Sequence, residues 1–554
     1  MISLTVVSAN EKVFLTGDPP EMRLPIYLFE GGEVSFQVNL WSDQPYYNGM
    51  LRFFPRDIGP RMTVRRVGLV PAVMDVAEYH DDGYVIRDDH LYPDVLEKID
   101  RRYLHNSTKT NQTFFITIHD DERIQPGTHS MGVRFYEDGK KMGFADFTLV
   151  KIPAPLPAQK CILTTWMHYD SFLNQHHVKP FTIEFYRLLG NYLDAAKIGG
   201  QNMILVPLIT PAFDTQVGRE RLSTQLLDIR EPEPGKFVFD FSEFNRFVRF
   251  VLSRGMKYLE MPPCFSQWGA EHAPKVLVHD AGGRIRHRFG WQTDALSDDY
   301  RNFLAQMLDA LHADLCELGV EDITFFHVSD EPNEEQLAHY TACKELIMQH
   351  IGNCRTIDAC SSLDFVGKTD REYSVCSIAT VQKYIDAGVR PLCTYYCCGP
   401  TAGYFTNRFL SQPLSRTAQL GFVLYRYNMD LFLHWGFNFY NSYLSRRPIN
   451  PYITTDGEGM FTAGDPFLVY PDHPGFSANP SLRLFAMGEA MRLSRMLYML
   501  EEYEGREAAL AFLDEEGVRG ITEYPRTQGW LDRLTWHLGA RLAAHVKNND
   551  SRRA

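Results

Sequence analysis

The sequence predicts a multidomain chain of β and α/β folds, an N-terminal β-sandwich followed by a (β/α)8 TIM-like barrel. Apolar and polar residues alternate with a period of two over the first 150 residues, which is typical of strands buried on one face. A proline-rich segment, 152–158, separates this region from the rest and predicts a stiff linker. Beyond the linker, short apolar runs alternate with helix-length amphipathic stretches, as in successive parallel βα units.

Residues 1–151 form the predicted sandwich. The stretch 34–40 places its Val, Phe and Leu side chains on one strand face at period two. Asp138-Gly139 lies between two strand-like stretches and predicts a hairpin turn. Helical signals are few in this region, and the best of them covers 92–99.

Residues 159–480 form the predicted catalytic barrel, and 481–554 form a C-terminal helical segment expected to pack on it. The candidate strands are 162–166, 203–208, 256–261, 324–328, 355–360, 373–378, 392–396 and 436–440. The clearest helices between them are 181–198, 241–254, 298–318 and 334–351, and a long helix is expected within 480–515. A doubly wound sheet is the alternative, but no glycine-rich phosphate loop follows any of these strands.

Composition excludes several classes of partner. The net charge is −13 and no long basic block occurs, so a nucleic-acid partner is not expected. No apolar run reaches the length of a membrane span, and the first ten residues resemble a strand more than a signal peptide. All ten cysteines follow residue 160, and the adjacent Cys397-Cys398 resemble no zinc spacing, which favours reduced thiols in a cytoplasmic protein. No metal or cofactor is expected. The oligomeric state stays open.

Asp330-Glu331 is the strongest candidate for catalysis. The two carboxyl groups follow the fourth apolar run of the predicted barrel, and Pro332 marks the end of that strand. Barrel enzymes carry their catalytic groups at this end of their strands. Adjacent carboxyls raise the pKa of one group, so a proton donor can stand beside a carboxylate, as cleavage of a glycosidic bond requires. The alternative is that the pair caps the following helix, where acidic residues are favoured.

A separate carboxylate nucleophile is not evident at the later strand ends. Asp358 lies inside the fifth run, whereas Asp456, Glu458 and Asp465 lie in a glycine-rich loop past the eighth. This favours substrate-assisted cleavage, in which the 2-acetamido oxygen of the substrate attacks the anomeric carbon. A glycosidase with two catalytic carboxylates that acts on a neutral sugar, and a non-catalytic carbohydrate-binding protein, remain the alternatives.

The segment 328–332, Val-Ser-Asp-Glu-Pro, resembles the active-site segment of glycoside hydrolase family 123. The stretch 435–441, Asp456-Gly457, Asp465-Pro466 and Tyr470-Pro471 also resemble the strand-eight region of that family. The resemblance implies a sandwich-plus-barrel fold and a retaining exo-glycosidase that releases terminal β-linked N-acetylgalactosamine with substrate assistance. It also implies that Asp330 stabilises the acetamido group and that Glu331 is the acid/base.

Two departures from the family leave the sugar open: Asp472 follows Tyr470-Pro471 where glycine is expected, and no secretion signal is seen. Further substrate contacts are predicted from position alone, at the ends of the first, seventh and eighth strands. For each of them a packed structural role is the alternative. These residues are Trp166, His168, Tyr395, Tyr396, Trp435, Asn438 and Asp465.

Overall fold

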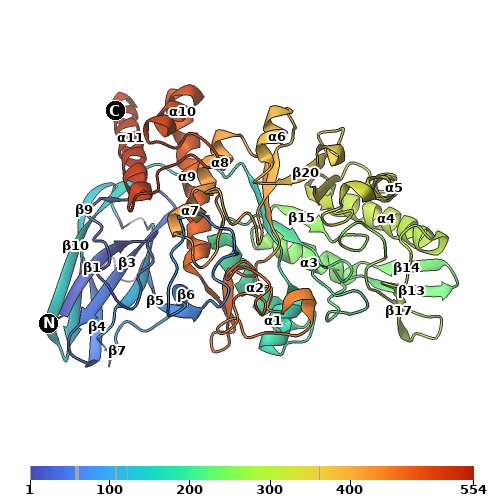
Figure 1. Cartoon of the computed structure of the whole chain (residues 1–554), viewed down its shortest axis with the longest axis horizontal. Helices are drawn as coiled ribbons and strands as arrows, with labels where there is room; N and C mark the ends of the chain where they lie inside the picture. The colour runs from blue at the N-terminus through green and yellow to red at the C-terminus, as the bar shows by residue number, and fades with distance from the viewer. Residues whose placement is uncertain are drawn as a thin grey trace. The chain divides into compact units, whose positions relative to one another are not determined.

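The computed structural model describes residues 2–56, 61–106, 109–121, 123–211, 213–360 and 362–553 (Figure 1). The chain divides into two compact units. The first, here called the sandwich unit, contains 1–159, 401–426 and 479–554; the second, the barrel unit, contains 160–400 and 427–478. These units differ from the expected boundaries, because 401–426 and 479–554 cluster with the N-terminal sheets.

Two five-stranded sheets form the core of the sandwich unit. One sheet has the order β1(Ile2–Ser8), β3(Glu33–Ser42), β8(Gln112–His119), β5(Met62–Pro71), β6(Leu91–Lys98). The other has the order β2(Ile26–Phe29), β10(Lys140–Ile152), β9(Gly127–Glu137), β4(Tyr46–Phe54), β7(Leu104–Asn106). The predicted hairpin joins β9 to β10, and both of its turn residues, Asp138 (φ 48°) and Gly139 (φ 80°), have the positive φ of a type I′ turn.

The predicted helix over 92–99 is wrong, because this segment is strand β6. It pairs antiparallel with β5 and forms the edge of its sheet. An edge position tolerates Pro93, which cannot donate a hydrogen bond to a neighbouring strand. Tyr92, Val95 and Leu96 are buried, so packing against the sheet overrides the local helical pattern.

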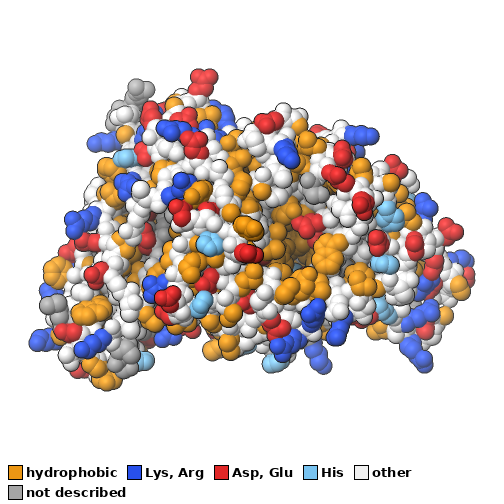
Figure 2. Space-filling view, viewed as in Figure 1, with side chains coloured by type: hydrophobic (Ala, Val, Ile, Leu, Met, Phe, Trp, Pro, Cys, Tyr) orange, Lys and Arg blue, Asp and Glu red, His pale blue; other side chains and the backbone are white. Residues whose placement is uncertain are grey.

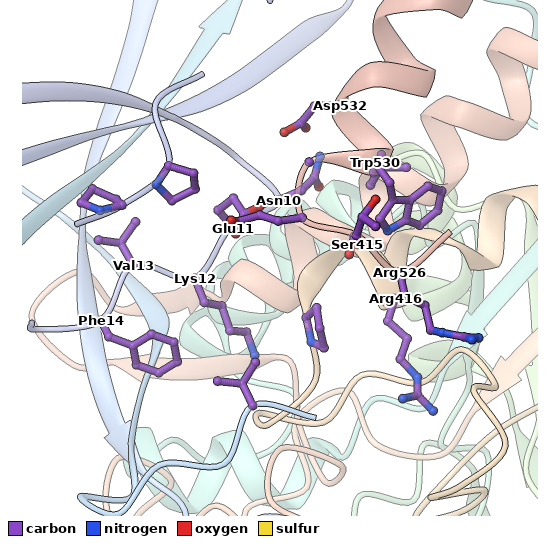
Figure 3. A pocket seen from close by; sticks show the side chains of 18 of the residues that line it. Asn10, Glu11, Lys12, Val13, Phe14, Ser415, Arg416, Arg526, Trp530 and Asp532 are labelled. Carbon is purple, nitrogen blue, oxygen red and sulfur yellow. The ribbon is translucent and has the colours of Figure 1, made fainter. Parts of the chain in front are cut away.

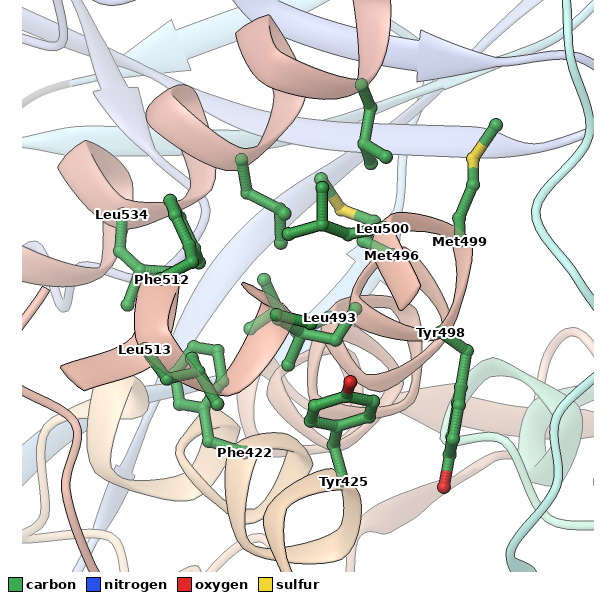
Figure 4. Packing of buried hydrophobic residues seen from close by; sticks show 14 of the residues in the cluster. Phe422, Tyr425, Leu493, Met496, Tyr498, Met499, Leu500, Phe512, Leu513 and Leu534 are labelled. Atoms are coloured by element: carbon green, nitrogen blue, oxygen red, sulfur yellow. The ribbon is translucent and has the colours of Figure 1, made fainter. Parts of the chain in front are cut away.

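Helices from the C-terminal part complete the sandwich unit. They are α7(Leu414–Ala418), α8(Leu420–Arg426), α9(Leu482–Glu504), α10(Arg506–Glu515) and α11(Trp530–Arg553). The long helix expected within 480–515 is therefore two helices, which meet at Gly505 with a φ of 87°. Figure 4 shows the apolar cluster that joins these helices, including Phe422, Leu493, Phe512 and Leu534. Tyr27, Phe29 and Ile152 of β2 and β10 belong to the same cluster.

The barrel unit contains the predicted closed barrel of eight parallel strands. The strands are β11(Ile162–Thr165), β12(Met203–Leu205), β15(Tyr258–Met261), β18(Thr324–Phe326), β19(Arg355–Ala359), β20(Glu372–Ser377), β21(Cys393–Tyr395) and β22(Leu431–His434). Branched and aromatic side chains fill the interior, among them Ile162, Leu205, Phe325, Ile357, Val375 and Leu433. Seven of the eight predicted strands are confirmed.

The eighth strand was predicted at 436–440 and lies instead at Leu431–His434. Only the four residues 427–430 separate its apolar run from α8, so the sequence pattern does not clearly distinguish the two elements. The 436–440 segment is a loop past the strand end, where the backbone N–H of Phe437 donates to the carbonyl of Trp166. Gly436 allows this loop to pass closely over its neighbour, since a Cβ there would lie 2.5 Å from the carbonyl oxygen of Pro466.

The connections between barrel strands are less regular than eight identical βα units. The predicted helices are found as α2(Ile183–Ile198), α3(Ser242–Ser253), α4(Asp298–Leu318) and α5(Leu337–Met348), beside the shorter α1(Tyr169–His176) and α6(Val381–Asp386). Between β19 and β20 the described residues contain only a short 3-10 helix, Leu363–Phe365. The other strands of the chain are β13(Asp228–Glu233), β14(Lys236–Asp240), β16(Val276–His279), β17(Ile285–Phe289), β23(Val469–Asp472) and β24(Ser477–Pro480).

The surface carries charges of both signs. Figure 2 shows Lys and Arg side chains interspersed with Asp and Glu over the face in view. Among the described helices, none combines the length and the apolar character needed to cross a membrane.

Candidate active site

A pocket of about 190 Å³ opens at the carboxyl ends of the barrel strands. Parallel strands bring the loops that follow them to one end of a barrel, where the active sites of barrel enzymes lie. Aromatic rings, three carboxyl groups and two thiols line the pocket. The lining residues are Trp166, Phe213, Asp214, Gln267, Trp268, Asp330, Glu331, Ala359, Tyr395, Cys397, Cys398, Leu433, Trp435, Tyr443 and Phe461.

Asp330 and Glu331 both line this pocket, although adjacent residues of a strand point to opposite faces. β18 has ended at Phe326, and Glu331 adopts the left-handed backbone conformation with a φ of 42°. The carbonyl of Asp330 is fixed by the backbone N–H of Trp268, at 2.8 Å. The turn at Glu331 is therefore what brings two consecutive carboxyl groups to one cavity.

Asp330 and Glu331 do not cap the helical turn that follows them, which was the alternative role for the pair. The cap of the following helical turn is Asn333, whose side chain accepts from the backbone N–H of Gln336. The side chain of Gln336 in turn accepts from the backbone N–H of Asn333, which completes a capping box. Asp330 and Glu331 are thus not needed to cap this turn.

The environment of Asp330 favours its protonated form. Burial, the neighbouring carboxylate of Glu331, and the charges of Asp358 and Asp214 raise the pKa of Asp330 well above its usual value, against an opposing effect of His327. Burial also raises the pKa of Asp214 to about 6, although Arg221 and the backbone N–H of Leu444 oppose the shift. The pocket therefore raises the pKa of two of its carboxyl groups, and perturbed carboxyl groups in a cavity are typical of acid/base sites.

Tyr395 contacts Glu331 directly. Its hydroxyl donates a hydrogen bond of 2.7 Å to Oε1 of Glu331. Burial and the adjacent Glu331 raise the pKa of this hydroxyl, so Tyr395 remains a donor at physiological pH. This contact orients the Glu331 carboxylate, whereas the sequence predicted a contact with substrate.

A buried ionic network lies beneath the pocket, and sequence reasoning missed its role. His327 Nε2 lies 2.6 Å from Oε1 of Glu260, and His327 Nδ1 lies 3.2 Å from Oδ1 of Asp358. Burial opposes the imidazolium, but the hydrogen bonds that its two N–H groups donate to Asp358 and Glu260 outweigh the effect of burial and raise the pKa of His327 to about 10. Glu260 also accepts from Trp166 Nε1 at 2.7 Å, and Asp358 accepts from the Tyr340 hydroxyl at 2.7 Å. The network thus fixes the floor of the pocket.

The remaining predicted contacts divide into two groups. Trp166 and Trp435 line the pocket, and Trp166 stacks on Phe213 with ring centroids 3.8 Å apart. Asp465, fully buried, accepts from Trp435 Nε1 at 2.9 Å and so holds that ring in place. These three residues belong to the pocket or its direct support.

Asn438, His168 and Tyr396 do not line the pocket. Asn438 is fully buried. Its side chain accepts a hydrogen bond from the backbone N–H of His168 and donates one to the carbonyl of the same residue, so it connects two loops and has a structural role. Burial and Arg221 lower the pKa of His168 to about 3, which leaves it neutral. Tyr396 is buried against Phe432 and His434, because it points away from the face that Tyr395 occupies.

Several lining residues come from loops that carry no strand signal, such as Asp214, Trp268 and Tyr443. The sequence did contain a signal for three residues of the buried network, Glu260, His327 and Asp358. Each is an ionisable residue inside or directly after an apolar barrel strand, and such a residue is costly to bury unless it is paired.

The sandwich unit contains a second pocket, of about 400 Å³ (Figure 3). Glu11 and Asp532 lie in its lining with Trp530, Arg416 and Arg526. Arg416 is neutralised by Asp81, whose carboxylate oxygens lie 2.8 and 2.9 Å from the guanidinium. This pocket does not lie at the strand ends of a barrel, and it lacks the adjacent carboxyl pair of the first.

The family model described as "Glycoside hydrolase 123, catalytic domain" matches residues 166–500, more than half of the chain. The chain belongs to glycoside hydrolase family 123. The family 123 member from Clostridium perfringens has a similar structure, with a TM-score of 0.71 and 16% identity, over 99% of this chain and 98% of that one. A family 5 xyloglucanase from Bacteroides ovatus also matches, over 88% of this chain and 100% of its own length. Its identity of 9% and TM-score of 0.30 are too low to indicate a shared fold. None of the curated proteins matches the sequence.

The family 123 assignment confirms the resemblance that the sequence indicated, and it makes this protein a glycoside hydrolase. The similar structure confirms the fold, from the sheet-rich N-terminal region to the closed parallel barrel.

Proposed function

We propose that this family 123 hydrolase is a retaining exo-glycosidase that releases terminal β-linked N-acetylhexosamine, with N-acetylgalactosamine as the first candidate. The observation that carries the proposal is the placement of two consecutive carboxyl groups, Asp330 and Glu331, in one pocket at the end of β18. One acid/base group with an adjacent carboxyl that orients an acetamido group is what substrate-assisted cleavage needs.

In the first step Glu331 gives its proton to the glycosidic oxygen as the bond to the anomeric carbon breaks. The acetamido oxygen of the substrate forms the new bond to that carbon, which gives a bicyclic oxazolinium ion and the free alcohol. Asp330 accepts a hydrogen bond from the acetamido N–H and stabilises the positive charge. Glu331, now a carboxylate, removes a proton from the water that opens the ring, so configuration is retained.

Substrate binding would also favour the carboxylate form of Asp330. In the free protein the pKa of Asp330 is raised, mainly by burial and by Glu331. An acetamido N–H that donates to Asp330 stabilises its carboxylate, because hydrogen bonding to the charged form favours that form. Asp330 can then orient the acetamido group as a carboxylate, which is its role in the proposed mechanism.

The dimensions of the pocket support a single sugar ring. Its volume of about 190 Å³ lies below the roughly 300–1,000 Å³ of pockets that hold larger ligands. Trp166, Trp435 and Trp268 offer flat apolar walls to the C–H faces of a sugar. The similar Clostridium perfringens enzyme is described as hydrolysing glycolipid glycans, and we extend that substrate class to this protein as part of the proposal.

The proposal is tested by measuring the release of nitrophenol from nitrophenyl β-N-acetylgalactosaminide. We expect Glu331→Gln to lower kcat by roughly 10²–10⁴-fold, because the variant removes the acid/base. Asp330→Asn should also lower kcat strongly. Glu334→Gln is the matched control, since Glu334 is an exposed neighbour that does not line the pocket, and it should retain the wild-type rate. Wild-type turnover by Glu331→Gln would refute the assignment.

Asp214 favours a second candidate, a glycosidase with two catalytic carboxylates. It lines the same pocket, and burial raises its pKa to about 6, so it is largely ionised at neutral pH. In this mechanism Asp214 is the nucleophile or the base, and substrates without an acetamido group are cleaved as readily as those with one. This mechanism predicts that the wild type hydrolyses a nitrophenyl β-galactoside and that Asp214→Asn does not. An enzyme that depends on substrate assistance would not hydrolyse this compound, because it lacks the acetamido group.

A further inference from the structure

Three potential metal ligands meet at the end of α4, outside the active-site pocket. His312 and Cys316 lie one helical turn apart on that helix, and Glu321 lies in the 3-10 helix that follows it. Their ligand atoms all lie within 4.8 Å of one another. Among the residues that the structure describes, this is the one group of three His, Cys, Asp or Glu side chains in which each offers a single ligand atom and all three atoms lie that close.

The spacing of these ligand atoms suits an ion with tetrahedral coordination. Zinc–nitrogen bonds are about 2.0–2.1 Å long and zinc–sulfur bonds about 2.3 Å. At a tetrahedral angle, a nitrogen ligand and a sulfur ligand of one zinc ion therefore lie about 3.5 Å apart. The observed distance from Cys316 Sγ to His312 Nε2 is 3.5 Å. His312 Nε2 and Glu321 Oε1 lie 2.8 Å apart as a hydrogen-bonded pair, so they would separate by about 0.6 Å around an ion.

The loop before β19 holds this group in place. A Cβ on Gly352 would lie 2.0 Å from His312 Nε2 and 2.7 Å from Glu321 Oε1, so only glycine leaves room for the two side chains to meet. The backbone N–H of Asn353 donates to Oε1 of Glu321 at 2.8 Å. Such outer hydrogen bonds orient carboxylate ligands in metal sites.

The location indicates what a bound ion would do. Glu321 directly precedes β18, and Gly352 and Asn353 directly precede β19, so the group lies at the amino ends of the barrel strands. Asp330 and Tyr395 lie at the opposite, carboxyl ends. The amino end of a barrel serves stability, whereas the carboxyl end serves catalysis.

We propose that His312, Cys316 and Glu321 bind a divalent transition-metal ion, zinc first, which links α4 to the 3-10 helix that precedes β18. One imidazole, one thiolate and one carboxylate are ligands that zinc accepts, and water would fill the fourth position. Cys316 is exposed, so an ion can enter from solvent, and the thiol releases its proton to solvent as the sulfur–metal bond forms. This site is independent of the proposed glycosidase mechanism.

Titration of the metal-free full chain with Co²⁺ tests the proposal, because a cobalt–thiolate bond gives a charge-transfer absorption in the near ultraviolet. We expect this absorption in the wild type and its loss in Cys316→Ser. His312→Gln should weaken Co²⁺ binding about tenfold or more. Cys398→Ser is the matched control, since it removes a different exposed thiol and should keep the absorption.

A second readout separates a metal site from a hydrogen-bonded cluster. Zinc should raise the thermal-unfolding midpoint of the wild type but not that of Cys316→Ser, while both turn over a glycoside substrate at the same rate. The proposal is overturned if wild-type protein gives no cobalt–thiolate absorption, if Cys316→Ser keeps it, or if zinc stabilises both proteins equally.

Discussion

At the scale of single residues, the hydroxyl of Tyr395 contacts Glu331 directly in the pocket. Tyr395→Phe removes a hydrogen bond to an ionisable group, which is worth about 1.5–3 kcal/mol. We therefore expect kcat to fall by roughly 10- to 100-fold with a smaller change in KM, measured on the nitrophenyl β-N-acetylgalactosaminide. Tyr396→Phe, which alters the adjacent tyrosine outside the pocket, is the control. Equal losses in the two variants would show that the contact with Glu331 has no special role.

His327 links stability to pH. Its pKa in the folded protein is about 10, above the 6.5 of an unfolded chain, because hydrogen bonds with Asp358 and Glu260 outweigh the effect of burial. The stabilisation is complete below pH 6.5 and is lost as the pH rises from there through 10. The wild-type thermal midpoint should therefore fall between pH 7 and 10.

His327→Gln tests this linkage. The variant leaves two buried carboxylates without their cation, so we expect a loss of about 3–5 kcal/mol near neutral pH. It should also lack the fall in thermal midpoint between pH 7 and 10 that His327 causes. A variant whose midpoint follows pH in parallel with the wild type would rule out His327 as the titrating group.

Sequence patterns located the two adjacent carboxyl groups of the pocket, Asp330 and Glu331, but not their surroundings. Asp330 and Glu331 could be found because an apolar strand ends just before them and Pro332 follows. Asp214 and Trp268 could not, since loops after strands have no periodicity that indicates where their side chains point. Tyr395 and Tyr396 were indistinguishable in the sequence, because the register of a three-residue strand decides which of them faces the pocket.

At the scale of elements, the helices of the sandwich unit depend on close backbone contact. A Cβ on Gly421 of α8 would lie 2.1 Å from the carbonyl oxygen of Ala490 on α9. Gly421→Ala should therefore push the two helices apart and lower stability by about 1–3 kcal/mol, measured by thermal unfolding. Gly190→Ala is the matched control, because its nearest neighbour would be a side-chain atom at 3.4 Å and alanine favours a helix. Unchanged unfolding of Gly421→Ala would contradict the close packing.

The two misassigned elements have one physical cause. Residues 92–99 and 431–434 take their conformations from neighbours distant in sequence, β5 in one case and β11 with β21 in the other. Helical periodicity in 92–99, and the aromatic run at 436–440, are local signals that these contacts override. The longer helices, such as α4, were predictable because their amphipathic pattern extends over several turns.

At the scale of the whole molecule, the chain order does not match the compact units. The apolar cluster of the sandwich unit combines Tyr27, Phe29 and Ile152 with residues of α9, α10 and α11. A fragment of residues 159–554 would expose the side of this cluster that β2 and β10 cover. We expect the fragment to aggregate in size-exclusion chromatography, whereas the full chain stays in a defined peak. A well-behaved fragment would show that the sheets are not needed to complete this core.

In the proposed mechanism the acetamido group of the substrate is the nucleophile, and Asp330 and Glu331 support it. The most direct test of this mechanism is the rate of hydrolysis of nitrophenyl β-N-acetylgalactosaminides whose acetyl methyl carries zero, one, two or three fluorine atoms. Fluorine withdraws electrons from the acetamido oxygen, so substrate assistance predicts that kcat/KM falls at each step. Equal rates across the series would contradict the mechanism and favour a carboxylate nucleophile such as Asp214.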